Sequence, residues 1–242
     1  MKAFLLAAGK GTRLHPLTSR TPKCLVPIDG MPLLGIWFRL LRSHGIDSVL
    51  VNTHHFPDQV RAYVEEHAVP GLDVRLVHEA ELLGTAGTVA ANPDFVEGED
   101  AFFILYADNL TDVDLTDFQA YHARHQSPFT MGLFETPEPK ECGIARCDGD
   151  GRIVDFEEKP AAPQSNLANS GLYIAGPELF TLMPDRPFVD FGFDLLPRMV
   201  GRMYGYRITN YFCDLGTMAR VERARREWCD MADTSFLVRY SS

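Results

Sequence analysis

The residues best suited to chemistry gather near the start of the chain, where residues 5–23 read LLAAGKGTRLHPLTSRTPK. An apolar stretch from Lys2 to Ala8 predicts a strand, and Gly9 and Gly11 follow it. Glycine lets the backbone turn through conformations closed to other residues and approach a ligand closely. Amide N–H groups exposed in such a turn form an anion-binding nest, to which nearby cations add charge. The stretch therefore predicts a phosphate site, with side chains supplied by Thr12, Arg13 and Lys23.

Two common phosphate-binding motifs do not fit this stretch. Leu14 stands where the dinucleotide fingerprint GxGxxG has its third glycine, which allows close packing of helix on strand. A P-loop needs a Gly-Lys pair followed by Ser or Thr, whereas here Gly11 follows Lys10. A glycine pair after a strand is also often a plain turn, and the glycines alone leave that alternative open.

Two aspartates stand at predicted strand ends. Asp108 follows the most apolar run of the chain, residues 101–107, and Asp214 follows the short strand-like run YFC. Taken singly, each also fits a turn, and Asp214 fits a helix entry with Thr217 as the N-cap. Open α/β sheets place ligands at the carboxyl ends of their strands. Two carboxylates there could hold one Mg²⁺, which prefers a few carboxylates together with phosphate and water oxygens.

Strand-like and helix-like runs alternate through the first half of the chain. Apolar residues at helical spacing, bounded by Pro32 and Gly45, predict a helix over about 32–44. The other expected elements are strands at 48–53, 73–78 and 101–107 and helices at 57–66, 85–91 and 114–125. Such alternation favours a mostly parallel sheet with helices on both faces. We therefore expect an α/β fold, a Rossmann-like three-layer sandwich around a central, mostly parallel mixed sheet.

The pattern changes after Phe129, where strands separated by turns predict a small antiparallel subregion. The turn Asp148-Gly149-Asp150-Gly151 is typical of a hairpin. The expected strands lie at 129–135, 144–147, 152–156, 172–175, 204–208 and 211–213, and the expected helices at 177–183, 193–203 and 217–231. Without repeats or a linker, we expect one domain over 1–230 and a tail over 231–242, in which residues 236–238 could pack on a partner.

Composition narrows the function classes. The chain has 242 residues and a net charge of −10, which argues against a nucleic-acid surface because that normally needs a basic face. Its five cysteines form no CxxC pair, which is typical of a reduced, cytoplasmic protein. We expect no signal peptide. No apolar run approaches the roughly 18 residues of a membrane span.

The longer string GxGTRLxPLTxxxPK resembles the sugar-phosphate nucleotidylyltransferases, or NDP-sugar pyrophosphorylases, and most closely their mannose-1-phosphate guanylyltransferase-type members. The resemblance recurs at intervals from Lys2 to about Thr217. It implies the reaction of a nucleoside triphosphate with a sugar 1-phosphate to give an NDP-sugar and pyrophosphate. It also implies a nucleotide-binding half over 1–128, a sugar-phosphate-binding half over 129–230, and Mg²⁺ as cofactor.

Roles for the nucleotide side follow from the resemblance. It implies that Asp108 and Asp214 hold the metal, although Ala107 departs from the glycine that the family often has there. Arg13 and the turn amides would hold the leaving phosphates, and Lys23 would reach the α-phosphate. The implied nucleotide-binding residues at this end of the chain are Leu6, Ala7, Ala8, Gly9, Gly11, Thr12, Arg13 and Lys23.

The segment Glu157-Glu158-Lys159-Pro160 resembles the family's EKP segment, although such a charged run is also typical of a solvated turn. The resemblance implies that Lys159 binds the sugar phosphate and Glu158 the sugar hydroxyls. A lysine suits this role as a mobile point charge. The other implied sugar-binding residues are Asn169 in an NxG segment, Gly143 and Asn109. The implied catalytic residues are Arg13, Lys23, Asp108 and Lys159.

The run LGTAG within residues 79–88 resembles the base-reading loop of guanylyltransferases and some uridylyltransferases. It makes Gly84, Thr85 and Gly87 candidates for the base, and a plain helix start with small residues is the alternative. His54 and His55 have no third ligand at zinc spacing, so we interpret them as loop or core residues.

The resemblance favours GTP with mannose 1-phosphate or a related heptose 1-phosphate. UTP or dTTP with a hexose or amino-sugar 1-phosphate is the alternative pair. A non-catalytic nucleotide-sugar sensor or regulatory subunit is the alternative of another class, although this chain keeps every charged position that the chemistry needs. We expect no nucleic-acid or membrane partner and leave assembly into a homo-oligomer open.

Overall fold

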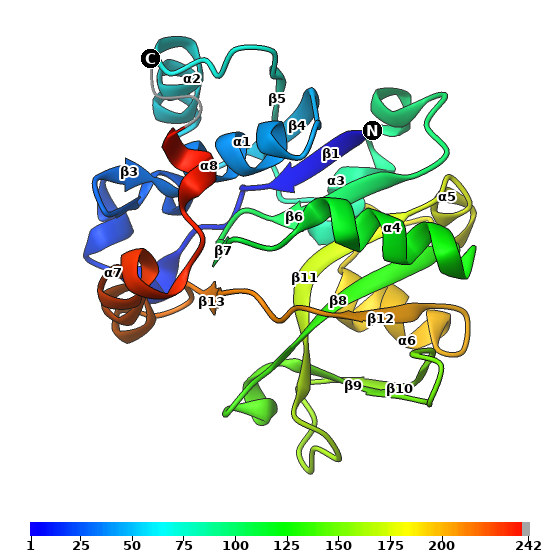
Figure 1. Cartoon of the computed structure of the whole chain (residues 1–242). Coiled ribbons are helices and arrows are strands. Elements are labelled where there is room, and N and C mark those ends of the chain that lie inside the picture. The colour runs from blue at the N-terminus through cyan, green and yellow to red at the C-terminus, as the bar shows by residue number, and fades with distance from the viewer. Residues whose placement is uncertain (239–242) are drawn as a thin grey trace. The chain divides into compact units, whose positions relative to one another are not determined.

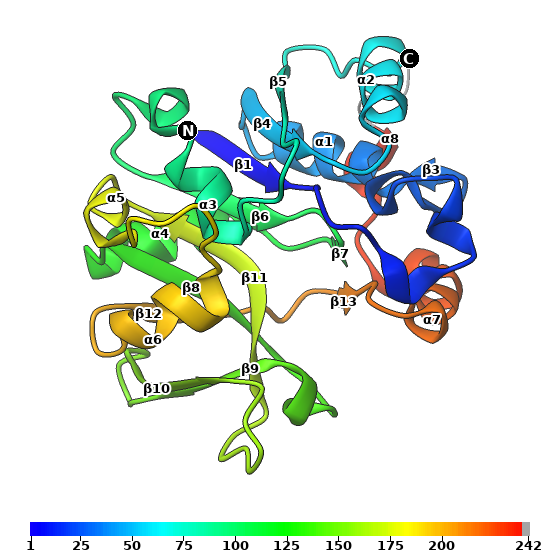
Figure 2. The same ribbon diagram turned by 180° about the vertical axis from the view of Figure 1, so that it is seen from behind.

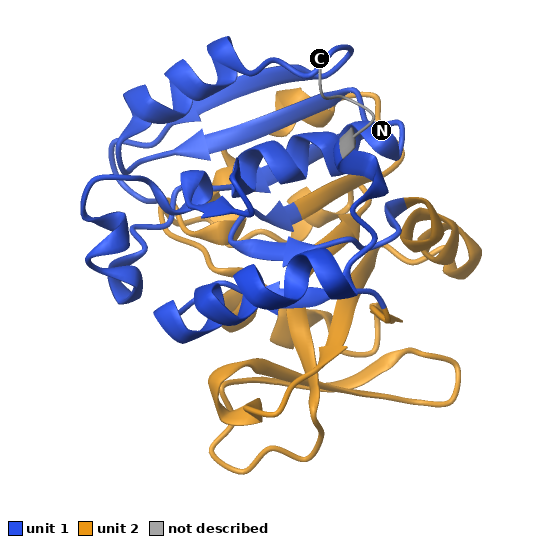
Figure 3. Ribbon diagram, turned by 60° about the vertical axis from the view of Figure 1, so that its left-hand side comes forward, with its two compact units in different colours: residues 1–82, 105–115, 210–242 blue, residues 83–104, 116–209 orange. Residues whose placement is uncertain are grey.

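The computed structural model describes residues 1–238, and the remaining four residues of the expected tail lie outside the described part. It divides the chain into two compact units (Figure 3). Unit 1 comprises Met1–Leu82, Leu105–Leu115 and Asn210–Ser242, and unit 2 comprises Leu83–Ile104 and Thr116–Thr209. Each unit is therefore built from segments that lie far apart in the sequence. The functional division expected at residues 128 and 129 stays a prediction.

Unit 1 contains a parallel group of strands in which β4 lies between β1 and β5 (Figure 1). These strands are β1 (Lys2–Leu6), β4 (Ser48–Thr53) and β5 (Asp73–His78). The unit also holds two short antiparallel pairs, β2 (Pro27–Ile28) with β3 (Met31–Pro32) and β7 (Asn109–Thr111) with β13 (Phe212–Asp214). Its helices are α1 (Leu33–Ser43), α2 (Pro57–Glu66), α7 (Met218–Met231) and α8 (Ser235–Val238), with 3₁₀ turns at Thr12–Leu14, Leu17–Ser19 and Lys23–Leu25.

Packing in the core of unit 1 positions strand β7, which Asp108 precedes. The apolar face of α1 is buried, as its spacing predicts, and it includes Trp37. The indole Nε1 of Trp37 donates a hydrogen bond of 2.9 Å to the backbone oxygen of Asn109 in β7. The packing of α1 is thereby tied directly to the strand that follows Asp108.

Unit 2 is mainly antiparallel (Figure 2). Strand β11 (Leu167–Ala175) pairs antiparallel with β8 (Phe129–Glu135) and β9 (Gly143–Cys147), and β9 pairs with β10 (Ile153–Glu158). Strand β12 (Tyr204–Arg207) runs parallel to β8. The short helices are α3 (Thr85–Ala90), α5 (Leu179–Leu182) and α6 (Leu196–Met199), with 3₁₀ turns at Pro93–Val96 and Pro139–Glu141 and a π-helical turn at Phe191–Leu195.

Two elements bridge the division of the chain. Strand β6 (Phe102–Tyr106) begins in unit 2 and ends in unit 1, and α4 (Leu115–His125) begins on the last residue of a unit 1 segment.

As a whole the chain has the expected α/β, Rossmann-like architecture, a mixed and mostly parallel central sheet with flanking helices. No helix within residues 1–238 is long and apolar enough to cross a membrane.

Several expected boundaries are wrong for identifiable reasons. The helix expected over 193–203 is instead a π-helical turn at Phe191–Leu195 that continues without a break into α6, where Pro197 fits the first turn because it lacks an N–H. Strand β11 begins at Leu167, five residues before the expected start, and it absorbs Gly171 as an irregularity with a φ of +72°. The α8 residue Phe236 packs on Trp228 of this chain, with ring centroids 6.4 Å apart, rather than awaiting another partner.

Candidate functional site

The glycine turn of unit 1 depends on Gly11. This residue has a φ of +62°, and a Cβ there would lie 3.0 Å from Thr18 Cγ2 and 3.3 Å from Lys23 Cβ. Its carbonyl oxygen accepts bonds from the Leu14 N–H at 2.9 Å and from Thr18 Oγ1 at 2.7 Å. At Gly9, by contrast, a Cβ would meet nothing within 4 Å. The turn is thus fixed at Gly11 and open at Gly9, as close approach by a ligand requires.

The strand end before the turn is held by a buried polar pair. Ala7 N–H donates to Asn52 Oδ1 at 2.7 Å, and Asn52 Nδ2 donates to Glu79 Oε1 at 2.8 Å. The carbonyl of Leu6 accepts from Ala107 N–H at 3.0 Å, and Ala8 is buried. Asn52 was missed from the sequence because it reads as part of the apolar run SVLVNT. The pair positions the backbone from which the predicted phosphate loop starts.

Lys23 points at Asp108. The lysine begins a 3₁₀ turn after Pro22 and is 8% exposed, and its Nζ donates to Asp108 Oδ2 at 2.7 Å. Asp108 lies two residues after the end of β6, and its carbonyl accepts from Leu215 N–H at 3.1 Å. Residues separated widely along the chain are therefore joined here by a charge-assisted bond.

Strand pairing carries Asp214 to the same place. Asp214 lies opposite Asn109 in the β7–β13 pair, so it stands beside the strand that Asp108 precedes. Burial raises the pKa of the Asp214 carboxyl, and the negative charge of Asp108 raises it further. The positive charges of Lys23, Arg220 and Arg13 act in the opposite direction. A carboxyl group whose pKa is raised by burial and by a neighbouring carboxylate is typical of a site built to hold a cation.

Two arginines complete this cluster. Arg220 Nη1 donates to Asp214 Oδ2 at 2.6 Å, and Thr217, the N-cap of α7, accepts from the Arg220 N–H at 3.3 Å. A Cβ on Gly216 would lie 3.1 Å from both Asp214 carboxylate oxygens and 3.2 Å from Arg13 Nη2. Arg13, Lys23, Asp108 and Asp214 are thus brought together in unit 1. Arg220 was not predicted from the sequence, because its place three residues after the helix cap is the only local sign that its side chain lies near Asp214.

The donor set suits a hard cation that takes its remaining ligands from substrate and water. Asp108 and Asp214 supply two carboxylates. No group of three or more His, Cys, Asp or Glu side chains that could hold a metal forms among residues 1–238. Mg²⁺ is commonly bound by one or two carboxylates together with phosphate oxygens and water, so these residues fit that ion. His54 and His55 accordingly contact the backbone oxygens of Glu79 and Thr18.

In unit 2, Glu158 lies beside Gly143. The two residues face each other across the β9–β10 pair, and a Cβ on Gly143 would overlap Glu158 Oε2. Burial raises the pKa of the Glu158 carboxyl; the Lys159 ammonium lowers it and the Asp190 carboxylate raises it. The missing side chain at position 143 therefore leaves room that the Glu158 carboxylate partly uses.

Lys159 adopts an uncommon backbone conformation. Its φ is +51°, and its N–H donates to Cys142 O at 3.1 Å. For a residue other than glycine such a conformation costs energy, and functional sites often carry this strain. Its Nζ lies 5.9 Å from the centroid of the Phe193 ring.

The two predicted asparagines lie in different units. Asn169 Nδ2 donates to the Tyr173 hydroxyl at 2.8 Å, and its Oδ1 accepts from Gly171 N–H at 2.9 Å. Asn109 lies in unit 1 and is 4% exposed, whereas the other predicted sugar-binding residues belong to unit 2. Both of these sugar contacts stay predictions.

The loop predicted to read the base packs against Val189 and Asp190 of the same unit. The N–H groups of Ala86 and Gly87 both donate to Val189 O, at 2.9 and 3.0 Å. Gly84 has a φ of +81°, and a Cβ there would overlap the same oxygen. At Gly87 a Cβ would lie 3.1 Å from Leu83 Cβ. These contacts fit the alternative that the small residues serve packing, and base recognition by this loop stays a prediction.

Asp190 organises this packing and was missed from the sequence. Its Oδ2 accepts from Thr85 Oγ1 at 3.0 Å, and its Oδ1 accepts from Phe193 N–H at 3.2 Å. Thr85 Oγ1 in turn accepts from Phe191 N–H at 2.9 Å. The charge of Asp190 also acts on Glu158. The predicted base loop and the EKP segment therefore share one neighbour.

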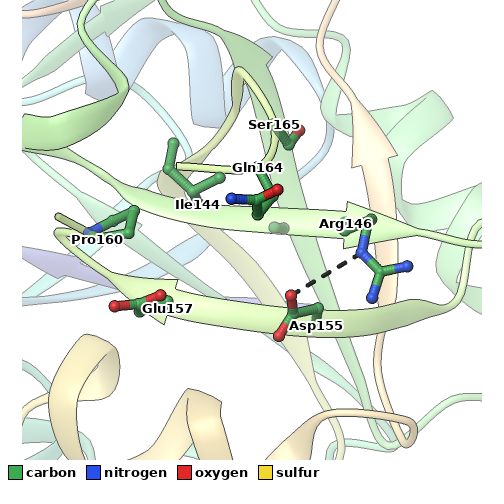
Figure 4. Close-up of a pocket in the computed structure, with 8 residues that line it drawn as sticks. Ile144, Arg146, Asp155, Glu157, Pro160, Gln164 and Ser165 are labelled. Carbon is green, nitrogen blue, oxygen red and sulfur yellow. Dashed lines mark ion pairs between the residues drawn. The ribbon is translucent and has the colours of Figure 1, made fainter. Parts of the chain in front are cut away.

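A shallow pocket lies on β9 and β10 near the EKP segment (Figure 4). Arg146 Nε and Asp155 Oδ2 face each other there at 3.9 Å. The lining residues are Ile144, Ala145, Arg146, Asp155, Glu157, Pro160, Gln164 and Ser165. None of them is a predicted site residue, although Glu157 and Pro160 flank Glu158 and Lys159.

Comparison with known proteins shows the family to which the chain belongs. A family model described as nucleotidyl transferase matches residues 2–230. The chain is 33% identical over 217 residues to a UTP–glucose-1-phosphate uridylyltransferase of Synechocystis sp., covering 83% of this chain and 55% of that protein. It is 32% identical over 221 residues to mannose-1-phosphate guanyltransferase beta-B of Xenopus laevis, covering 89% and 61%.

A solved structure from Bacillus anthracis, described provisionally as a glucose-1-phosphate thymidylyltransferase in complex with sucrose, has the same fold. It matches with a TM-score of 0.86 at 23% identity, over 98% of this chain and 99% of that one. The names of these relatives include three different bases. The chain spans only 55% and 61% of the lengths of the two curated relatives.

Proposed function

The chain belongs to the nucleotidyl transferase family, and on that premise we propose that it joins a nucleoside triphosphate to a sugar 1-phosphate, giving an NDP-sugar and pyrophosphate. The observation that carries the proposal is the cluster in unit 1. There Lys23 bonds Asp108, Arg220 bonds Asp214, and the charge of Asp108 raises the pKa of the Asp214 carboxyl. A plain turn or a helix cap would not need these cations and anions together.

The reaction needs little covalent help from the protein. An oxygen of the sugar phosphate, already anionic, attacks the α-phosphorus, and the bond from that phosphorus to the leaving pyrophosphate breaks. Because the nucleophile carries no proton to remove, no general base is required. The main tasks are to bring two polyanions together, align them for in-line attack and stabilise charge that shifts to the leaving group.

The residues of unit 1 would bind the triphosphate. Arg13 and the amides of residues 9–12 would hold the leaving phosphates, and Lys23 would move from Asp108 to the α-phosphate. Asp108 and Asp214 would hold Mg²⁺, which neutralises phosphate charge in reactions of this class. Residues 6–8, fixed by Asn52, would place the loop.

The residues of unit 2 would bind the sugar phosphate. Lys159 would hold the phosphate whose oxygen attacks, and Glu158 would accept hydrogen bonds from sugar hydroxyls. Gly143 has no side chain, so the Glu158 carboxylate and the Phe156 ring occupy the space that a Cβ would fill. Asn169 is a further candidate for a hydroxyl, and Gly84, Thr85 and Gly87 are candidates for the base.

Among substrates we favour GTP with mannose 1-phosphate or a related heptose 1-phosphate. This choice rests on the LGTAG loop and on a guanyltransferase relative. UTP or dTTP with a hexose or amino-sugar 1-phosphate is the second candidate, favoured by the uridylyltransferase relative. A sensor that binds nucleotide sugars without turnover is the candidate of another class.

An assay of pyrophosphate release distinguishes the two candidate substrate pairs and the sensor. The chain is incubated with Mg²⁺ and each combination of four nucleoside triphosphates with glucose, mannose, heptose and amino-sugar 1-phosphates. Release that needs both substrates and stops with EDTA supports the proposed reaction and identifies the pair. Binding of an NDP-sugar without release from any combination would favour the sensor.

A further inference from the structure

Phe193 is an exposed aromatic residue beside the predicted sugar-phosphate residues. Its side chain is 62% exposed, so it contributes little to the core of unit 2. Single exposed apolar residues are common on protein surfaces, and exposure alone carries no function. The position of this ring relative to its neighbours is more informative.

Two charged groups lie near Phe193, one beside its ring and one beside the preceding residue. Lys159 Nζ lies 5.9 Å from the ring centroid, within the range of about 6 Å over which a cation is attracted to an aromatic face. A Cβ on the preceding residue, Gly192, would lie 2.6 Å from Glu158 Oε2. An ammonium, a carboxylate and an aromatic face therefore border one region of unit 2.

Hydrogen bonds fix the backbone of Phe193. Phe193 N–H donates to Asp190 Oδ1 at 3.2 Å, and Asp190 is itself bonded to Thr85. The residue lies within the π-helical turn Phe191–Leu195, whose first residue is fully buried. Phe193 is thus an exposed side chain on an anchored backbone, as expected of a ligand contact rather than of a loose surface residue.

These three groups match the chemistry of a pyranose 1-phosphate. Its phosphate suits the ammonium, its hydroxyls suit the carboxylate, and the weakly positive C–H bonds on one side of the sugar ring suit the negative face of an aromatic ring. We propose that Phe193 is a specificity-determining residue that packs on the C–H face of the sugar while Lys159 leaves the aromatic ring for the phosphate. The inference rests on the proposed function.

The test compares three variants. Phe193→Ala removes the ring, Phe193→Tyr keeps an aromatic face, and Phe188→Ala removes a phenylalanine that is 54% exposed and lies five positions earlier. We expect Phe193→Ala to raise the KM for the sugar 1-phosphate about tenfold with kcat little changed. The KM for the nucleotide should stay the same. Phe193→Tyr and Phe188→Ala should both resemble the wild type.

A binding measurement decides the inference independently of turnover. Saturation-transfer NMR with mannose 1-phosphate and glucose 1-phosphate reports which ligand protons contact the protein. We expect transfer to the sugar-ring C–H protons in the wild type, its displacement by inorganic phosphate, and its loss in Phe193→Ala. Equal transfer and equal KM in the wild type and Phe193→Ala would overturn the inference while leaving the proposed function intact.

Failure of the proposed function can also be distinguished from failure of the inference about Phe193. If no substrate pair releases pyrophosphate, the proposed function fails, and the saturation transfer alone decides whether Phe193 contacts a sugar phosphate. Absence of any transfer in the wild type would overturn the inference as well.

Discussion

The two units hold their candidate phosphate-binding cations differently. In unit 1 two cations are bonded to carboxylates, since Lys23 bonds Asp108 at 2.7 Å and Arg220 bonds Asp214 at 2.6 Å. In unit 2 the ammonium of Lys159 lies over the face of Phe193. A bond between opposite charges in a half-buried site is stronger than a cation–aromatic contact at the surface.

This difference predicts how each site should respond to the removal of its cation. Removing a cation from unit 1 leaves a carboxylate unpaired near a second carboxylate, so both catalysis and stability should suffer. Removing Lys159 leaves an aromatic ring that tolerates water. We therefore expect unit 1 to control the barrier and unit 2 to control sugar-phosphate binding.

The largest effect is expected from Lys23→Ala. Because Lys23 would stabilise charge that develops only in the transition state, its loss should lower kcat about 100- to 1000-fold. Asp108→Ala should fall in the same range. Single-turnover measurement separates chemistry from product release, and Lys140→Ala, an exposed lysine, is the control. Rates within a few-fold of the wild type for both variants would end the assignment.

Lys159→Ala should act mainly on binding. We expect kcat/KM for the sugar 1-phosphate to fall about 10- to 100-fold, most of it in KM, because the charge contacts the ground-state phosphate as well. Steady-state kinetics at saturating nucleotide measures the split. A loss confined to kcat would show that the two units do not differ in the way proposed.

Gly84→Ala and Gly9→Ala compare a packed glycine with an open one. Gly84 has a positive φ and faces Val189 O, so its alanine variant should lose about 1–3 kcal/mol of stability. Gly9 has open space, so its variant should stay within about 0.5 kcal/mol of the wild type. Urea unfolding followed by circular dichroism measures both. Equal losses would contradict the packing interpretation of residues 83–88.

Arg220→Ala tests the pairing in unit 1. Because Asp214 would lose its partner beside Asp108, we expect a loss of about 1–2 kcal/mol, between the values of exposed and buried ion pairs. Mg²⁺ should restore more stability to this variant than to the wild type, since a second cation replaces the arginine. Thermal unfolding with and without Mg²⁺ measures this, with the exposed Arg226→Ala as control. Restoration equal to that of the wild type would argue against a shared metal.

Glu158→Gln should give the smallest change. Because the folded-state pKa of Glu158 is raised, its protonated form is favoured by folding. Its stabilising contribution is complete below the ordinary carboxyl pKa of 4.5 and is lost as pH rises through the raised value. The wild type should therefore lose stability relative to Glu158→Gln over that window. Urea midpoints from pH 4 to 7 provide the measurement, and parallel curves would contradict it.

The sequence predicts best where a local pattern decides the structure. Strand β4 and helix α2 have the expected bounds, because a continuous apolar run and a proline at a helix start are local signals. The hairpin at 148–151 follows from its glycines in the same way, and Asp148 O accepts the Gly151 N–H at 3.2 Å. The expected convergence of Lys23 with Asp108 came from the resemblance rather than from any pattern.

Features that depend on distant partners could not be predicted. Strand β7 has three residues and exists because β13 pairs with it, from a segment more than ninety residues away in the sequence. The packing of Gly84 depends on Val189, and the direction of Arg220 depends on where Asp214 lies. None of these contacts produces a periodic pattern in the sequence.

The placement of Asp108 and Asp214 on either side of residues 116–209 has a consequence for biosynthesis. As the ribosome extends the chain, Asp108 emerges with Lys23 available to it, while its fellow carboxylate is still untranslated. The two carboxylates can come together only once all of unit 2 has been made. A nascent chain therefore lacks the complete carboxylate pair until that point.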